Sequence, residues 1–437
     1  MNQWQTGGKL KTGGYRTFLR TPEFAFYGIS ALGILFFILL SFYYGRPAYV
    51  WMVQENQPAI RFTDYFMHLT ASMDRHQLYQ KVTDPQIGCF PPLAYLMYFF
   101  LYRLTPLAFE MVENYEEMEL IPGTMQVFTY YLIFSALLFY VGISKTGKRS
   151  TRRDLSIFTL LMASAVFSGS GYMMGNSAML VLAMLVIAFV LKDGPSCLGR
   201  EAALMLFAIC IGIKLYPAIF GLMYLKEKRY RELGRLVFYS LALVFLPFVF
   251  FGGIEGVKAW VGNILATMAS EGQSDFGRPQ YLKGLLFTLL KLLTGREYLM
   301  LASVLTWLIC AGWAYLAWQS KSSLRTEFFL ICILVFFPTN AFRYTLGFFS
   351  IPLIARLKSD DIFVKGSGVE RVVMALYGLL FSIPVWWIAV DGLEKRYEKY
   401  NYTLSSVEIC LYLTAWMLIL TMIVLEIREK RKSYCQS

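Results

Sequence analysis

The stretch that decides the fold runs from Arg61 to Tyr98 and reads RFTDYFMHLTASMDRHQLYQKVTDPQIGCFPPLAYLMY. Its charged or titratable side chains are Arg61, Asp64, His68, Asp74, Arg75, His76, Lys81 and Asp84. A charged side chain near the centre of a bilayer costs about 2.5–3.5 kcal/mol, so this stretch must lie outside the hydrocarbon. We expect a charged, aromatic loop held against one face of a membrane, a place suited to chemistry.

The composition of the whole chain is that of an integral membrane protein. Of its 437 residues, 57% are hydrophobic and only 16% are charged, whereas soluble domains carry about 25% charged residues. Lys and Arg number 41 against 29 Asp and Glu, which gives a net charge of +12. In a membrane protein this excess is typical of cytosolic loops beside anionic lipid, and we expect no binding of nucleic acid.

The sequence offers no metal or nucleotide site. Its seven cysteines form no CxxC pair, and its two histidines, His68 and His76, lie away from any matching ligand set. A P-loop, a GxGxxG turn that opens a helix and a GxSxG motif are all missing from the sequence. We therefore expect no metal ion and no other cofactor.

The apolar segments predict an all-α polytopic membrane protein with about 12 transmembrane helices. Segment 93–104 is too short to span, so we expect it to lie on the outer leaflet. If it crossed, the acidic run 110–119 would lie inside and the basic run 145–153 outside, against the charge rule. The expected spans are residues 24–44, 127–144, 155–168, 173–191, two short helices within 201–225, 236–251, 298–318, 327–338, 343–357, 371–390 and 406–426.

This topology places both termini in the cytosol. It divides the chain into a cytosolic segment, residues 1–23, a transmembrane domain, residues 24–426, and a cytosolic tail, residues 427–437. Within the transmembrane domain, a first outer loop covers residues 45–125 and a second covers residues 252–297.

A helix break is predicted inside segment 201–225. Gly212 and Pro217 flank Lys214, and glycine, proline and a lysine in an apolar run together favour a break. Lys214 is then expected at the outer turn between two short helices.

Polar residues of the outer loops, and polar residues within the membrane-spanning segments, are expected to meet at the outer face of the membrane. A carboxylate there can take a proton from an attacking hydroxyl, and lysine and arginine can hold phosphate oxygens. Structural roles stay open for some of them, because Asn176 can cap the helix that follows and Lys214 can extend its amine to the membrane surface. The candidate residues are Asp64, Asp74, Arg75, His76, Tyr79, Asn176, Lys214, Gln273, Arg278, Arg343 and Tyr344.

The order of these motifs along the chain resembles that of the GT-C membrane glycosyltransferases. The likeness covers residues 24–350. Within this superfamily the chain resembles glycosyltransferase family 87, which includes polyprenol-phosphate-mannose-dependent α-mannosyltransferases. The motifs that carry it are Asp64, Leu78-Tyr79 and Phe90-Pro91-Pro92-Leu93, then Gly175-Asn176, then Ile213-Lys214-Leu215-Tyr216-Pro217 before a basic loop, and Tyr281-Leu282-Lys283-Gly284-Leu285.

The resemblance implies a GT-C fold and an inverting transfer of mannose or another hexose or pentose from a polyprenyl-phosphate sugar. The acceptor would be lipid-linked or a glycan, on the outer face of a bacterial plasma membrane, with membrane lipid as a further partner. Asp64 matches the family's base, and Lys214 would lie near the donor phosphate. Apart from the resemblance, the grouping of polar residues at the outer face makes Arg343 and Tyr344 further candidates for binding the donor phosphate. The remaining substrate-binding candidates are Asp74, Arg75, His76, Tyr79, Asn176, Gln273 and Arg278.

Two departures from the family pattern bear on the sugar and the acceptor. Asn176 stands where the family often has glutamine, and Phe342-Arg343-Tyr344 stands where relatives often carry tryptophan and histidine. A transporter or flippase of lipid-linked glycans, or a polymerase or ligase of them, remains an alternative. The large first outer loop and the lack of paired internal repeats favour the enzyme.

Overall fold

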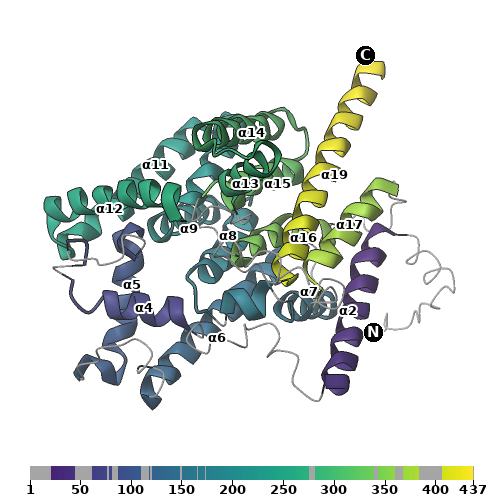
Figure 1. Cartoon of the computed structure of the whole chain (residues 1–437). Coiled ribbons are helices and arrows are strands. Elements are labelled where there is room, and N and C mark those ends of the chain that lie inside the picture. The colour runs from purple at the N-terminus through teal and green to yellow at the C-terminus, as the bar shows by residue number, and fades with distance from the viewer. Residues whose placement is uncertain are drawn as a thin grey trace, which may run out of the picture.

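The computed structural model describes most of the chain as a helical assembly (Figure 1). Among the described residues every regular element is a helix and no β-strand occurs, which confirms the all-α class. The described residues are 21–44, 62–75, 78–80, 87–109, 118, 121–147, 150–164, 166–172, 174–274, 281–338, 343–359, 368–382 and 406–436.

The chain combines α-helices with short 3-10 and π segments. The first part of the chain contains α2 (Pro22–Tyr44), α4 (Thr63–Ala71), η2 (Ile87–Cys89), α5 (Pro92–Arg103), η3 (Pro106–Phe109), α6 (Pro122–Lys145), α7 (Thr151–Met162) and η5 (Val166–Tyr172). The middle contains α8 (Ala178–Lys192), α9 (Cys197–Ile213), η6 (Tyr216–Phe220), α10 (Gly221–Lys226), α11 (Tyr230–Phe245), η7 (Leu246–Phe250) and α12 (Gly253–Ser274). The last part contains α13 (Leu282–Thr294), α14 (Leu299–Gln319), α15 (Ser323–Phe336), η8 (Arg343–Phe349), α16 (Ser350–Leu357), α17 (Gly368–Leu380) and α19 (Ser406–Gln436).

Several helices are long and apolar enough to cross a membrane, so the chain is an integral membrane protein. Five such spans occur within the described residues, and they are Pro22–Leu39, Pro122–Lys145, Tyr230–Phe250, Leu299–Gln319 and Cys410–Arg431. Many leucine, phenylalanine and tryptophan side chains on these helices are exposed, as expected of surfaces that lipid covers. The predicted number of about 12 transmembrane helices stays a prediction.

The centre of the molecule is α8, which packs against α6 on one side and α9 on the other (Figure 1). Its sequence, AMLVLAMLVIAFVLK, is apolar all round, and nearly all of its residues are buried. A helix without a polar face belongs in a core, surrounded by other helices. The site described below lies at the N-terminal end of α8.

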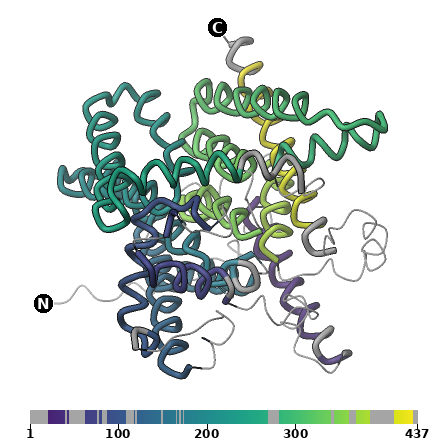
Figure 2. The backbone as a smooth tube through the Cα atoms, turned by 60° about the vertical axis from the view of Figure 1, so that its left-hand side comes forward, coloured from purple at the N-terminus to yellow at the C-terminus, as the bar shows by residue number. Residues whose placement is uncertain are grey.

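Segments far apart in the sequence close the outside of the assembly. Helix α2, near the N-terminus, lies side by side with α17, from the C-terminal part (Figure 2). Glycine at position 378 permits this contact, because a Cβ there would meet the Ile29 side chain at 3.0 Å and the Phe26 carbonyl at 3.2 Å.

Residues 252–297, predicted to be an outer loop, contain two helices that the sequence pattern did not indicate in full. Helix α12 is 22 residues long, although its glycines are unfavourable for an isolated helix. It is stabilised by tertiary contacts: Trp260 Nε1 donates to the Cys89 carbonyl at 3.0 Å, and Asn263 Nδ2 donates to the Tyr79 carbonyl at 3.0 Å. Helix α12 therefore packs on the segment that precedes α5.

Two other helical segments continue beyond the spans expected from the sequence. Residues 169–172, between the expected spans 155–168 and 173–191, are part of a π-helix, η5, which lies against η8. Helix α19 does not end at residue 426 but continues to Gln436, because its basic C-terminal residues are as compatible with helix as the apolar ones before them. The predicted tail, residues 427–437, is thus mostly helical.

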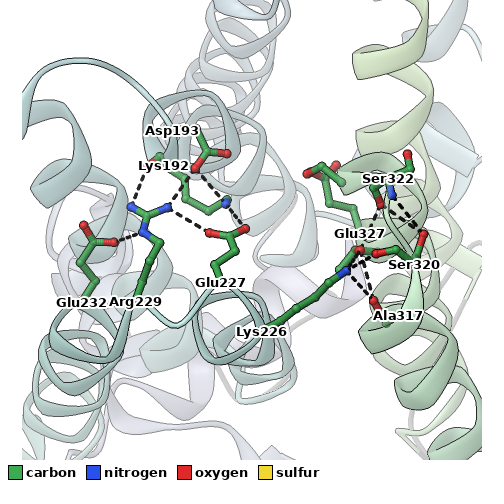
Figure 3. Close-up of polar contacts among 12 residues, drawn as sticks. Lys192, Asp193, Lys226, Glu227, Arg229, Glu232, Ala317, Ser320, Ser322 and Glu327 are labelled. Carbon is green, nitrogen blue, oxygen red and sulfur yellow. Dashed lines mark hydrogen bonds and ion pairs between the residues drawn. The ribbon is translucent and has the colours of Figure 1, made fainter.

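The C-terminal end of α8 carries a network of ion pairs (Figure 3). The buried Lys192 ammonium contacts the carboxylates of Asp193 at 3.0 Å and Glu227 at 2.7 Å, and Arg229 binds both of these acids. Nearby, Lys226 Nζ donates to carbonyls at the end of α14. The network lies a full helix length from the N-terminus of α8, about 20 Å at 1.5 Å per residue.

The length of α5 leads to a prediction about sidedness. Its 12 residues cover about 18 Å, less than the roughly 30 Å of a bilayer core, whereas α6 is long enough to cross. In a background without native cysteines, we expect Arg103→Cys to react with an impermeant thiol reagent in intact cells. Arg152→Cys should react only after permeabilisation. The reverse pattern would mean that α5 crosses the membrane.

Candidate active site

Asp64 lies in the first turn of α4, where it meets a turn from a distant part of the chain. Asn176 Nδ2 donates a hydrogen bond to Asp64 Oδ2 at 2.6 Å. The neighbouring Tyr65 amide donates to the Met174 carbonyl at 3.2 Å. Both bonds join α4 to the residues that lead into α8, so the carboxylate is fixed against the central helix.

A glycine is required directly before Asn176. Gly175 has a φ of +66°, a left-handed conformation, and a Cβ there would come within 2.6 Å of both the Phe128 ring and the Tyr65 Cβ. Only glycine fits this combination of backbone angle and close packing. Gly175 therefore allows the backbone to place the side-chain amide of Asn176 against α4.

Asn176 serves two purposes at once. Its Oδ1 accepts a hydrogen bond from the Ala178 amide at 2.8 Å, which caps the start of α8. Its Nδ2 is then directed to Asp64. The structural role considered for Asn176 in the sequence is real, but it leaves the amide nitrogen available for the carboxylate.

The surroundings of Asp64 suit a base. Burial raises the pKa of its carboxyl above the ordinary value, while the bond from Asn176 and the positive charge of Lys214 act in the opposite direction. A carboxylate with a raised pKa holds a proton more strongly, which suits a group that accepts a proton from a substrate hydroxyl.

Lys214 lies in the predicted break, directly after the last residue of α9. Its backbone is extended, with φ −143° and ψ 125°, and its side chain is only 6% exposed. Lys214 Nζ lies 4.5 Å from the centre of the Phe90 ring, 5.5 Å from that of Tyr344 and 5.9 Å from that of Tyr216. The ammonium is therefore surrounded by aromatic faces.

No carboxylate within the described part of the chain lies within ion-pair distance of the Lys214 ammonium, although Asp64 is close enough to interact with it electrostatically. No acceptor there receives a hydrogen bond from it. Cation–π contacts compensate only part of the cost of burying a charge. A buried cation in this state is suited to bind an anionic group of a ligand.

Tyr344 completes the site from the far end of the chain. It is 4% exposed, it borders Lys214, and it also interacts with Asn176. Arg343 precedes it as the first residue of η8 and is partly exposed. The structure thus brings together Asp64, Asn176, Lys214 and Tyr344, with Arg343 next in the chain.

The comparison with family models identifies the chain. The model of glycosyltransferase family 87 matches residues 91–339, which is more than half of the sequence. The chain belongs to glycosyltransferase family 87. It is therefore a glycosyltransferase, and its GT-C superfamily placement follows from the family. Neither the search of curated proteins nor the search of solved structures found a match.

The family match covers part of the site. Asn176 and Lys214 lie within residues 91–339, whereas Asp64 and Tyr344 lie just outside them. The two groups of residues meet only in the folded protein, through the bond between Asp64 and Asn176 and the contact between Lys214 and Tyr344.

Tyr79 supports the site of this family 87 protein indirectly. It is buried, and its hydroxyl donates to the Phe90 carbonyl at 2.9 Å. The Lys214 ammonium in turn lies over the Phe90 ring. Tyr79 therefore fixes the position of a residue that contacts the lysine.

The other candidates are not gathered around Asp64 in the described part of the chain. Asp74 is exposed, and the Arg75 guanidinium lies over the Phe99 ring at 4.4 Å. His76 and Arg278 lie outside the described residues, and so does the side chain of Gln273, which belongs to the last turn of α12. Their roles stay predictions.

Three residues of the site were not selected from the sequence: His68, Phe90 and Tyr216. His68 follows Asp64 by four residues, the spacing that places two side chains on one face of a helix. The four-residue spacing could be read from the sequence. It indicates a shared face only if residues 63–71 form a helix, and the charges of this segment do not predict a helix.

The bond between Asn176 and Asp64 leads to a prediction on pH dependence. In Asn176→Ser a hydroxyl can still cap α8, but it is too short to reach the carboxylate. Because the lost bond lowers the pKa of Asp64, we expect the acidic limb of the profile of kcat/KM against pH to move to higher pH. Ser177→Ala is the control and should leave the limb in place. An unchanged limb in Asn176→Ser would contradict Asp64 as the titrating base.

Proposed function

We propose that this family 87 glycosyltransferase transfers a sugar from a polyprenyl-phosphate donor to a hydroxyl of a lipid-linked or glycan acceptor. The observation that supports this is the proximity of a hydrogen-bonded, base-like carboxylate, Asp64, to a buried ammonium, Lys214, that forms no direct ion pair among the described residues. One group can accept a proton and the other can bind a phosphate.

The proposed step is a single displacement. The acceptor hydroxyl attacks the anomeric carbon and gives its proton to Asp64, while the bond from that carbon to the phosphate oxygen breaks. The electron pair leaves with the polyprenyl phosphate, whose growing charge is stabilised by Lys214. Attack from the opposite face inverts the anomeric centre, so a β-linked donor gives an α-linked product.

The site is expected to face the outside of a bacterial plasma membrane, with both termini in the cytosol. Asp64 lies in α4, between α2 and α6, and both of these helices contain candidate spans. The basic residues before α2 and after α6 favour a cytosolic location for those ends. The segment between them then reaches the outer surface.

A panel of radiolabelled polyprenyl-phosphate sugars tests the proposal and identifies the sugar. Purified protein in detergent or liposomes is incubated with mannosyl, glucosyl, galactosyl and arabinosyl donors and a membrane lipid extract. We expect one donor to label a lipid or glycan product in the wild type and not in Asp64→Asn. Labelled product with nucleotide sugars alone would contradict the proposed donor class.

A further inference from the structure

His68 lies on the same face of α4 as Asp64, one turn later, and is almost completely buried, with 2% exposure. Its ring packs among three aromatic rings, with centre-to-centre distances of 4.3 Å to Phe90, 5.2 Å to Tyr98 and 5.7 Å to Tyr95. The proposed transfer step does not use this side chain. A buried imidazole beside a reaction site requires an explanation.

The hydrogen bonds of Tyr95 determine which ring nitrogen of His68 carries the proton. The Tyr95 hydroxyl donates its only hydrogen to the Ile87 carbonyl, which can only accept. The contact between Tyr95 Oη and His68 Nδ1, at 3.4 Å, must therefore have the histidine as its donor. Nδ1 carries the hydrogen, and Nε2 keeps a free lone pair.

The ring is uncharged at all working pH values. Burial, together with the charge of Lys214, lowers the pKa of His68 to about 3. Nε2 is thus a neutral acceptor, and no donor within the described part of the chain forms a hydrogen bond with it. An acceptor without a protein donor in this part of the chain can take a hydrogen bond from a hydroxyl of a ligand.

Phe90 links this acceptor to the phosphate-binding cation. Lys214 Nζ lies 4.5 Å from the Phe90 ring centre, and the His68 ring lies 4.3 Å from it. The charge of Lys214 also acts on the His68 ring, so the group that adjoins a phosphate bound at Lys214 can reach the imidazole. In a polyprenyl-phosphate sugar that adjoining group is the sugar ring, which carries hydroxyl donors.

We propose that His68 Nε2 accepts a hydrogen bond from a hydroxyl of the donor sugar and so contributes to the choice of sugar. The inference rests on the proposed function, because it assumes a phosphate-linked sugar at Lys214. A site built to accept a hydroxyl hydrogen discriminates against ligands that lack one, since its acceptor is then left unpaired.

Equilibrium binding to purified protein separates sugar recognition from phosphate recognition. The probes are farnesyl phosphate, without a sugar, and farnesyl-phosphoryl mannose, glucose, galactose and arabinose. We expect His68→Phe, which keeps an aromatic ring in the cluster, to weaken the preferred sugar-bearing probe by about three- to ten-fold. Its affinity for farnesyl phosphate should not change.

Three further variants serve as controls. Lys214→Met should weaken both kinds of probe. His68→Gln, whose amide oxygen can take the position of Nε2, should restore part of the lost affinity. Tyr98→Phe removes a hydroxyl from the same aromatic cluster without touching a hydrogen bond of His68, and it should bind both probes as the wild type does.

The outcomes distinguish the inference from the proposed function. If His68→Phe weakens both probes equally, or neither, His68 has only a packing role and the inference is overturned. If no sugar-bearing probe binds the wild type better than farnesyl phosphate does, the proposed donor class itself fails. A loss confined to the sugar-bearing probe, with recovery in His68→Gln, supports the inference.

Discussion

Replacing Asp64 with asparagine is expected to lower the transfer rate by about 10²–10⁴-fold, the usual effect of losing a positioned general base. The change is nearly isosteric. The carbonyl oxygen of the new amide side chain can still accept the bond that Asn176 donates at 2.6 Å in the wild type, so the contact between α4 and the start of α8 is kept. What disappears is the ability to take a proton from the acceptor hydroxyl.

The stability of this variant should not fall. Burial raises the pKa of Asp64 in the folded protein, so the folded state binds a proton more strongly than the unfolded chain does. The ionised form consequently costs stability at neutral pH, and that cost grows as pH rises through the interval between the two pKa values. An uncharged amide avoids it, and we expect the thermal midpoint of Asp64→Asn at pH 7 to equal or exceed that of the wild type.

The matched control is Asp74→Asn, the same substitution at an exposed carboxylate ten positions further along the chain. It should retain most of the wild-type rate. Transfer is measured with the donor that the labelled panel identifies, at saturating donor, and binding of farnesyl phosphate is measured in parallel to show that the site is intact. If Asp64→Asn keeps more than about a tenth of the rate while Asp74→Asn loses activity, the base lies at Asp74.

The part of the site that the sequence could predict follows from charge and backbone chemistry. Asp64 was recognisable because its segment carries charges that no bilayer tolerates, and Lys214 because glycine and proline beside it interrupt an apolar helix. The structure has the break at the predicted place, with Lys214 at the end of α9 and η6 beginning at Tyr216. Each of these inferences needs only neighbours in the chain.

The remainder depends on contacts between distant residues. Asp64 and Asn176 are separated by 112 positions, and no local pattern indicates that they meet. Helix α12 is a further case, because its intrinsic preference is weak and its bonds to the carbonyls of Cys89 and Tyr79 come from another loop. His68 could be identified as a site residue only from two facts together. Its segment is helical, and Tyr95 and Phe90 surround its ring.

The second large effect is expected at Lys214. If its ammonium holds the donor phosphate, Lys214→Met removes a charge-assisted hydrogen bond worth roughly 1.5–3 kcal/mol, and the apparent donor KM should rise by about ten-fold or more. The kcat should fall as well, because the phosphate gains charge as it leaves. Lys214→Arg keeps the charge but spreads it over a planar group, so only partial recovery is expected.

The variant also predicts a change in pH dependence that a packing defect would not cause. The charge of Lys214 lowers the pKa of Asp64, so its removal should raise that pKa and move the acidic limb of kcat/KM to higher pH, as Asn176→Ser does. A methionine that only disturbs the aromatic surroundings would lower the rate equally at every pH. The pH profile therefore separates an electrostatic role from a structural one.

Lys192 provides a matched control for the same substitution. It is also a buried lysine, with 1% exposure, but it lies at the opposite end of α8 and is paired with Asp193 and Glu227 (Figure 3). Lys192→Met leaves these carboxylates with fewer partners and should lower the thermal midpoint, with the donor KM unchanged. Lys214→Met removes a cation that forms no direct ion pair among the described residues and should lower the donor affinity with little loss of stability. If donor KM and kcat are unchanged in Lys214→Met, the amine has no contact with the phosphate, and Arg343 becomes the cation to test.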